Sequence, residues 1–360
     1  MPERRLRESK SSTRFPAIKQ GAARFCYRVL NSVRMHIPRL VAIVALATVL
    51  RVAANDTAVT LGAGGLIPAR SSAIVMESED LQISVHQITV KYVFRNTGGH
   101  DLDLMVAFPL PEIDGGAAAN VPIDFPSRDP LNFLDFEVFV AGRKIAPKTE
   151  VRSFFNGSEI TSELRSLGLP LSALDANVAA AMKKLTVADR SRVEKSGWVD
   201  CSLTNDGRCW PYWQSRIQFY WTQRFKAGAA VEVTHTYRPV VGGGAMYGGD
   251  SLAYEADYFH RYCPGADALD QIRRKLAGEK FDGAHPVLRQ REIQYILTTA
   301  NNWSGPIRSF HLSVISDSQE GVVATCLPNL TRVTPARYEL LRANFRPDRE
   351  IELLVLQAAK

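Results

Sequence analysis

Residues 88–96 read Ile-Thr-Val-Lys-Tyr-Val-Phe-Arg-Asn, and this stretch decides the fold class. Apolar or aromatic side chains recur at every second position from Ile88 to Phe94, with Thr89 and Lys91 between them. That period predicts a β-strand with one face buried and one face toward water. Residues 96–99, Asn-Thr-Gly-Gly, follow as a turn.

The same pattern of short alternating segments continues on both sides of this strand. Glycine, asparagine and proline separate the segments, and the turns at residues 141–143 and 226–228 each predict a hairpin. We therefore predict a mainly β protein with an antiparallel β-sandwich body. The further predicted strands are residues 73–76, 81–85, 102–110, 133–140, 145–155, 217–225, 231–241, 293–299, 307–315, 322–326, 338–345 and 351–356.

Residues 158–200 interrupt the strands with helical spacing and predict a helical insertion. A first helix is expected over residues 158–167. Ser172 with Asp175 resembles a capping box for a second helix to about residue 184, and Thr186 with Asp189 repeats it for a third that ends near Gly197. The insertion separates an N-terminal β-sandwich part, residues 55–157, from a C-terminal β part, residues 201–360.

Two further segments of the C-terminal part depart from the strand pattern. A short helix is expected near residues 267–277, before Gly278. Residues 242–249 contain so many glycines that they predict a mobile loop. They lack the strand and helix context of a dinucleotide site and the Gly-Lys-Ser/Thr of a phosphate loop.

The net charge of +7 belongs to the first 54 residues. That segment holds eleven Lys and Arg against two acids, whereas the remainder carries a net charge of −2. Nucleic-acid binding therefore loses its electrostatic basis, and no nucleic acid is expected as a partner.

Residues 1–54 have the three-part pattern of a signal peptide. Basic residues precede an apolar run over residues 40–50, and the small residues before Asn55 suit cleavage between Ala54 and Asn55. Met35 is an alternative start. The eleven-residue apolar run is short of the roughly 20 residues that a spanning helix needs. We therefore expect a periplasmic or secreted protein with no stable membrane span after cleavage, although an uncleaved membrane tether stays open.

Four cysteines follow the leader: Cys201, Cys209, Cys263 and Cys326. An even number in an exported chain predicts two disulfides, for which three pairings exist. Cys201 and Cys209 are close in sequence and flank a strong turn signal, so we predict that they pair and that Cys263 pairs with Cys326.

A set of segments runs in order along the chain: residues 54–57, 64–66, 79–84, 90–96, 106–111, 233–237 and 302–307. Together they resemble a bacterial family of exported proteins, domain of unknown function 4424. The resemblance covers nearly the whole mature chain and implies an exported protein, but it implies no activity, because the family has none assigned. Residues 86–152 also resemble the start of vault/inter-α-trypsin (VIT) domains, which implies a β-sandwich.

Aromatic residues are densest around the predicted Cys201–Cys209 loop. Exposed Trp and Tyr side chains can stack on sugars or anchor a protein partner. We take Trp198, Trp210, Tyr212 and Trp213 as candidate binding residues and expect at least one of them to be accessible. The more common role of such residues is to pack a core, and that alternative stays open.

No motif names an activity. The seven histidines show no HExxH spacing, no CxxC and no GxSxG occurs, and we expect no metal, no cofactor and no identifiable catalytic residue. The leading hypothesis is an exported bacterial envelope protein of unknown function that is a non-enzymatic binding or structural module for a protein or glycan of the envelope. The alternative is an enzyme of envelope glycans or other polymers with a dispersed active site. Its oligomeric state does not follow from the sequence.

Overall fold

A computed structural model describes residues 57–62, 65–120, 125–202, 208–246, 261–277 and 287–359, which belong to one compact unit. The predicted leader, with Ala54, Asn55 and Met35, lies outside the described residues.

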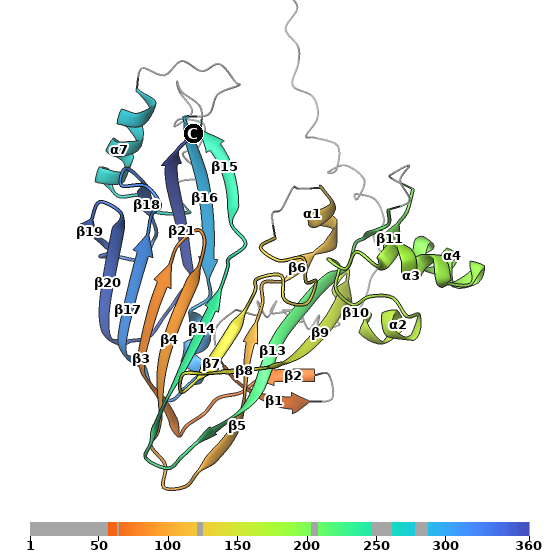
Figure 1. Cartoon of the computed structure of the whole chain (residues 1–360), viewed down its shortest axis with the longest axis horizontal. Coiled ribbons are helices and arrows are strands. Elements are labelled where there is room, and N and C mark those ends of the chain that lie inside the picture. Colours follow the sequence, from red (N-terminus) through yellow and green to blue (C-terminus); the bar gives the residue numbers. More distant parts are fainter. Residues whose placement is uncertain are drawn as a thin grey trace, which may run out of the picture. The chain divides into compact units, whose positions relative to one another are not determined.

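The described residues form two large sheets. The first follows the order β10-β9-β13-β5-β1-β2, with β6 also paired to β13, and the second follows β19-β20-β17-β3-β4-β14-β7-β8 (Figure 1). The strands of the first are β1 (Thr57–Gly62), β2 (Gly65–Pro68), β5 (Leu102–Pro109), β6 (Ile113–Asp114), β9 (Lys148–Phe155), β10 (Ser158–Glu159) and β13 (Gln214–Phe225). Those of the second are β3 (Ile74–Ile83), β4 (Ile88–Asn96), β7 (Glu137–Val140), β8 (Arg143–Ile145), β14 (Ala230–Tyr237), β17 (Ile307–Ile315), β19 (Thr331–Thr334) and β20 (Arg337–Phe345).

Two smaller sheets complete the β structure of the described residues. One has the order β15-β16-β21-β18, and the other is the pair β11-β12. Their strands are β11 (Val199–Asp200), β12 (Trp210–Pro211), β15 (Gly242–Met246), β16 (Leu288–Tyr295), β18 (Val322–Ala324) and β21 (Ile351–Ala358). The helices are α1 (Gly115–Asn120), α2 (Thr161–Ser166), α3 (Val178–Lys184), α4 (Val187–Lys195), α7 (Ala266–Leu276) and the 3-10 helix η1 (Thr298–Asn302).

The main core lies between the inner faces of the two large sheets. Residues 88–96 form β4, in which every second side chain from Ile88 to Asn96 is buried. Rings from both sheets meet there: Phe108 of β5 lies 4.4 Å from Phe136, which stacks 5.1 Å from Phe219 of β13. His235 of β14 completes this group, 5.2 Å from Phe108. The mainly β, sandwich-like fold is therefore confirmed.

The pairing of the strands departs from a purely antiparallel arrangement. Within the described residues β17 runs parallel to β3, whereas the other strand pairs are antiparallel. Strands from either side of the helical segment also pair with each other: β13 pairs with β5 and β9, and β14 pairs with β4.

The hairpin expected at residues 226–228 is wrong. β13 and β14 belong to different sheets, so this turn carries the chain from one layer of the sandwich to the other. The short turn shows that the chain reverses, but both strands find their hydrogen-bond partners in distant parts of the sequence. Asn96 supports this crossing, because its side-chain amide donates to the carbonyl oxygens of His100 and Phe225.

The prediction of a mobile loop over residues 242–249 is wrong for its described part. Gly242–Met246 form the edge strand β15, which pairs with β16. Glycine suits this close pairing, because a Cβ at Gly243 would lie only 3.0 Å from the backbone carbonyl oxygen of Gln290. Residues 247–249 lie outside the described residues.

Helices α2, α3 and α4 occupy the segment expected to be helical. Thr186 accepts a hydrogen bond from the backbone N–H of Asp189 and caps α4 as predicted. The capping box at Ser172 is wrong: α3 begins at Val178, and the Ser172 hydroxyl donates to the carbonyl oxygen of Pro130. The first helix starts at Thr161, because Ser158–Glu159 pair with β9.

Helix α7 covers a second, smaller core. Its buried Ile272 and Leu276 pack with Leu288, Val322 and Leu354 of the four-stranded sheet. Among the described helices, none combines the length and apolarity that a membrane crossing needs.

Candidate functional site

The pair β11-β12 sorts its side chains onto two faces. Val199 lies opposite Pro211 in the register, and both are buried. Because side chains alternate along a strand, the flanking residues Trp198, Trp210 and Tyr212 lie on the other face. The backbone N–H of Tyr212 donates to the carbonyl oxygen of Trp198, which extends the ladder by one residue pair. We call the side chains of Trp198, Trp210 and Tyr212 the aromatic face.

All three rings of the aromatic face are half-buried. Trp198 touches the edge of the main core. Trp210 carries the Arg208 guanidinium 5.6 Å from its ring centre, a cation–π arrangement. The Tyr212 ring lies against Gly116 of α1, where a Cβ would come within 3.1 Å of Tyr212 Cδ1. The face is therefore partly accessible and held by local contacts.

The prediction of Trp213 as a binding residue needs correction. Trp213 is 0% exposed, and its indole N–H donates to the carbonyl oxygen of Leu171 at 3.0 Å. Trp213 is therefore a core residue that a partner cannot reach, and it is not part of the aromatic face. The alternation that turns Tyr212 outward turns the next residue into the core.

Both predicted cysteine pairs stand at disulfide distance. The Sγ atoms of Cys201 and Cys209 are 2.09 Å apart, and those of Cys263 and Cys326 are 1.92 Å apart. Cys201 and Cys209 stand next in line after the pair Asp200 and Trp210 of the β11-β12 register, and both pack against the main core, as Trp198 does. The first bond thus ties the two strands together at the end of the ladder.

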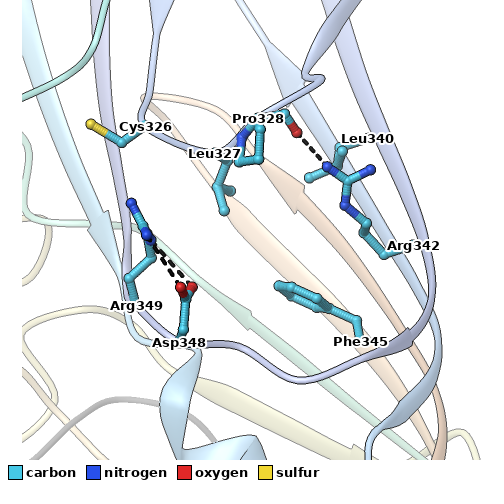
Figure 2. Close-up of a pocket in the computed structure, with 8 residues that line it drawn as sticks. All are labelled: Cys326, Leu327, Pro328, Leu340, Arg342, Phe345, Asp348 and Arg349. Carbon is cyan, nitrogen blue, oxygen red and sulfur yellow. Dashed lines mark hydrogen bonds and ion pairs between the residues drawn. The ribbon is translucent and has the colours of Figure 1, made fainter.

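The second disulfide adjoins a surface pocket, which Figure 2 shows. Cys326, Leu327 and Pro328 form one wall, and β20 with the segment after it forms the rest. The pocket measures about 240 Å³ and is lined by Cys326, Leu327, Pro328, Leu340, Arg342, Phe345, Asp348 and Arg349. No sequence motif marks these residues, which come from two segments about 15 positions apart in the chain.

A buried carboxyl group lies where β3 faces β16. Glu79 is 0% exposed, and Tyr295 donates a hydrogen bond to its Oε1 at 2.9 Å. The Tyr295 hydroxyl also lies 2.9 Å from that of Tyr92. Burial raises the pKa of Glu79 to about 8, although the hydrogen bond from Tyr295 lowers it in part. The side chain is sealed from solvent, so it cannot contact a polymer substrate.

His235 lies close to this group and is also 0% exposed. Its ring is 5.5 Å from that of Tyr92 and 5.7 Å from that of Trp221, both edge-on. Burial lowers the pKa of His235 to about 3, which keeps the imidazole neutral. His235 is therefore a core residue of β14.

A metal site in a protein is built from several His, Cys, Asp or Glu side chains that converge on one point. No group of three or more His, Cys, Asp or Glu residues in that part of the chain has the geometry to hold an ion.

Comparison with known proteins supports the family and leaves the activity open. No curated protein matches the sequence. One solved structure to which the chain is similar is a putative nutrient binding protein from Legionella pneumophila. It shares 15% identity and a TM-score of 0.40, over 84% of this chain and 71% of its own. The model of the domain of unknown function DUF4424 matches residues 54–354. The chain therefore belongs to the DUF4424 family.

Proposed function

We propose that this chain is an exported binding module that contacts a protein or glycan of the cell envelope through its aromatic face. The observation that carries the proposal is the placement of Trp198, Trp210 and Tyr212 on one face of a ladder whose strands a disulfide ties together. Two disulfides also suit an oxidising compartment, in agreement with the expected leader.

The chemistry of the face suits recognition. Trp, Tyr and Arg are the residues that most often dominate binding energy at interfaces, and Arg208 lies over Trp210. Aromatic rings lose little conformational freedom on binding, because each has only two rotatable side-chain bonds. The Cys201–Cys209 bond lowers the cost further by holding the backbone in place.

The alternative of an envelope-polymer enzyme calls for two acidic groups that a substrate can reach. The carboxyl group with the most strongly raised pKa among the described residues is Glu79, and it is enclosed in the core beside Tyr295. Glu79 therefore cannot serve as one of these two acidic groups.

Capture of envelope material by the purified exported form tests the proposal. Trp210→Ala and Tyr212→Ala should each lower the retained material at least about tenfold, as loss of an interface hot spot does. Tyr220→Ala is the matched control, because Tyr220 is a half-buried tyrosine on β13 outside the aromatic face. Digesting the extract beforehand with a protease or with a glycan hydrolase separates a protein partner from a glycan. Equal retention by Trp210→Ala and the unmodified chain would rule out the aromatic face.

A further inference from the structure

The pocket beside the Cys263–Cys326 bond combines an apolar lining with arginines. Leu327 and Leu340 are nearly buried, and Phe345 is half-buried with its ring 5.0 Å from that of Phe310. In Figure 2 Leu327 and Phe345 point toward the space between Arg342 and Arg349. Such a site matches a ligand that has both an apolar part and a polar end.

The wall formed by residues 326–328 is held in position. The disulfide ties Cys326 to Cys263 across 63 residues of sequence. Proline fixes its own backbone φ at Pro328, and Asn329 takes a φ of 64°, a left-handed conformation that asparagine tolerates in turns.

The opposite wall is held as well. The carbonyl oxygen of Pro347 accepts a hydrogen bond from the Asn301 side chain at 2.8 Å. The Glu350 carboxylate accepts hydrogen bonds from the backbone N–H groups of Leu297 and Thr298. Both walls are therefore formed before a ligand arrives, which lowers the cost of binding.

The two arginines of the pocket differ in their partners. Arg349 pairs with Asp348 at 3.2 Å, and both are exposed. Arg342 is half-buried and donates to the carbonyl oxygen of Pro328 at 2.5 Å. Among the described residues no carboxylate lies within ion-pair distance of Arg342, so none of them neutralises its charge. A guanidinium can donate two parallel hydrogen bonds to a carboxylate, which makes it the more specific cation for that group.

We infer that this pocket binds a small organic carboxylate, with its carboxylate on Arg342 and its apolar part against Leu327, Leu340 and Phe345. The volume of about 240 Å³ lies below the range usual for drug-sized ligands, so the acid is small. This site is separate from the aromatic face, since the two share no residue.

Ligand-observed NMR titration of the exported form with phenylacetate, phenylacetamide and inorganic phosphate tests the inference. Phenylacetate should bind at least about tenfold more tightly than the amide, because only the acid forms a charge-assisted pair. Phenylacetate should also bind more tightly than inorganic phosphate, because phosphate has no apolar part. Arg342→Gln should lower the phenylacetate affinity about tenfold, and Arg346→Gln, an exposed arginine on the same segment that does not line the pocket, should leave it unchanged.

Equal affinity for the acid and the amide, or absence of binding to phenylacetate, would overturn the inference. An unchanged affinity in Arg342→Gln would do the same. If Arg342→Gln does not fold, the acid and amide compared on the unmodified chain decide the matter alone. Envelope capture is not part of this titration, so either proposal can fail without the other.

Discussion

Tryptophan occurs in two different environments in this protein. One is the buried interior between the two large sheets, and the other is the partly exposed aromatic face of β11-β12. Trp213 is enclosed and hydrogen-bonded to Leu171, whereas Trp210, three positions earlier, is half-buried on the aromatic face. The difference teaches that a cluster of aromatic residues is not one site. Strand alternation divides it into residues that stabilise the fold and residues that can contact a partner.

The largest effect should follow from breaking the interior at Trp213. Trp213→Ala removes a fully buried ring and leaves the carbonyl of Leu171 without this donor, so the free energy of unfolding should fall by about 3–5 kcal/mol. Urea denaturation followed by circular dichroism measures it. A loss below about 1 kcal/mol would mean that Trp213 is not a core residue in solution.

The two disulfides extend the comparison, because one closes a short ladder and the other ties distant segments together. In the chain-entropy treatment, removing Cys263–Cys326 costs about 4 kcal/mol and removing Cys201–Cys209 about 2.5 kcal/mol. Replacing both Cys263 and Cys326 by serine should therefore lower the midpoint of thermal unfolding more than replacing both Cys201 and Cys209 by serine. The reverse order in differential scanning calorimetry would contradict this account.

The interior also contains a carboxyl group, Glu79, whose burial makes the stability of the fold depend on pH. Glu79 keeps its proton up to about pH 8 in the folded chain but loses it near its ordinary value of 4.5 when unfolded, so it lowers stability as pH rises between these values. Burial of His235 has the opposite effect below pH 6.5, where stability increases as pH rises. In that range the imidazole is protonated in the unfolded chain but stays neutral in the folded chain. Below pH 4.5 His235 therefore acts alone, between pH 4.5 and 6.5 the two slopes cancel, and Glu79 acts alone in the range from pH 6.5 to 8.

In that range the free energy of unfolding should fall by about 2 kcal/mol in the unmodified chain. Glu79→Gln, which does not titrate, should show little change over the same range. Denaturant titrations at pH 6.5, 7.25 and 8 provide the measurement. A parallel fall in both proteins would show that Glu79 is not the group responsible.

The smallest effect on stability should come from the aromatic face itself. Trp210→Ala removes a half-buried ring outside the main core, so the free energy of unfolding should fall by less than about 1 kcal/mol. Urea denaturation of Trp210→Ala and Trp213→Ala under the same conditions compares the two losses of stability. The comparison separates a tryptophan that can contact a partner from one that stabilises the core. A loss as large as that of Trp213→Ala would place Trp210 among the core residues.

The sequence by itself determined the features that depend on nearby residues. Alternation over Ile88–Asn96 indicated a half-buried strand, and β4 has that burial pattern. Thr186 and Asp189 identified the start of α4, because a cap is formed within one turn of helix. The pairing of Cys201 with Cys209 followed from their closeness around a turn.

Only the tertiary structure decided what depends on distant partners. The turn at residues 226–228 has the same local signal whether it joins two paired strands or crosses between sheets, and only the pairing of β13 with β5 and of β14 with β4 shows the crossing. The burial of Glu79 against Tyr295 and the meeting of Leu327 with Arg342 at one pocket likewise join residues from separate strands and turns. Local propensity and spacing act over a few residues, whereas these features arise from the packing of whole layers, which no short stretch of sequence specifies.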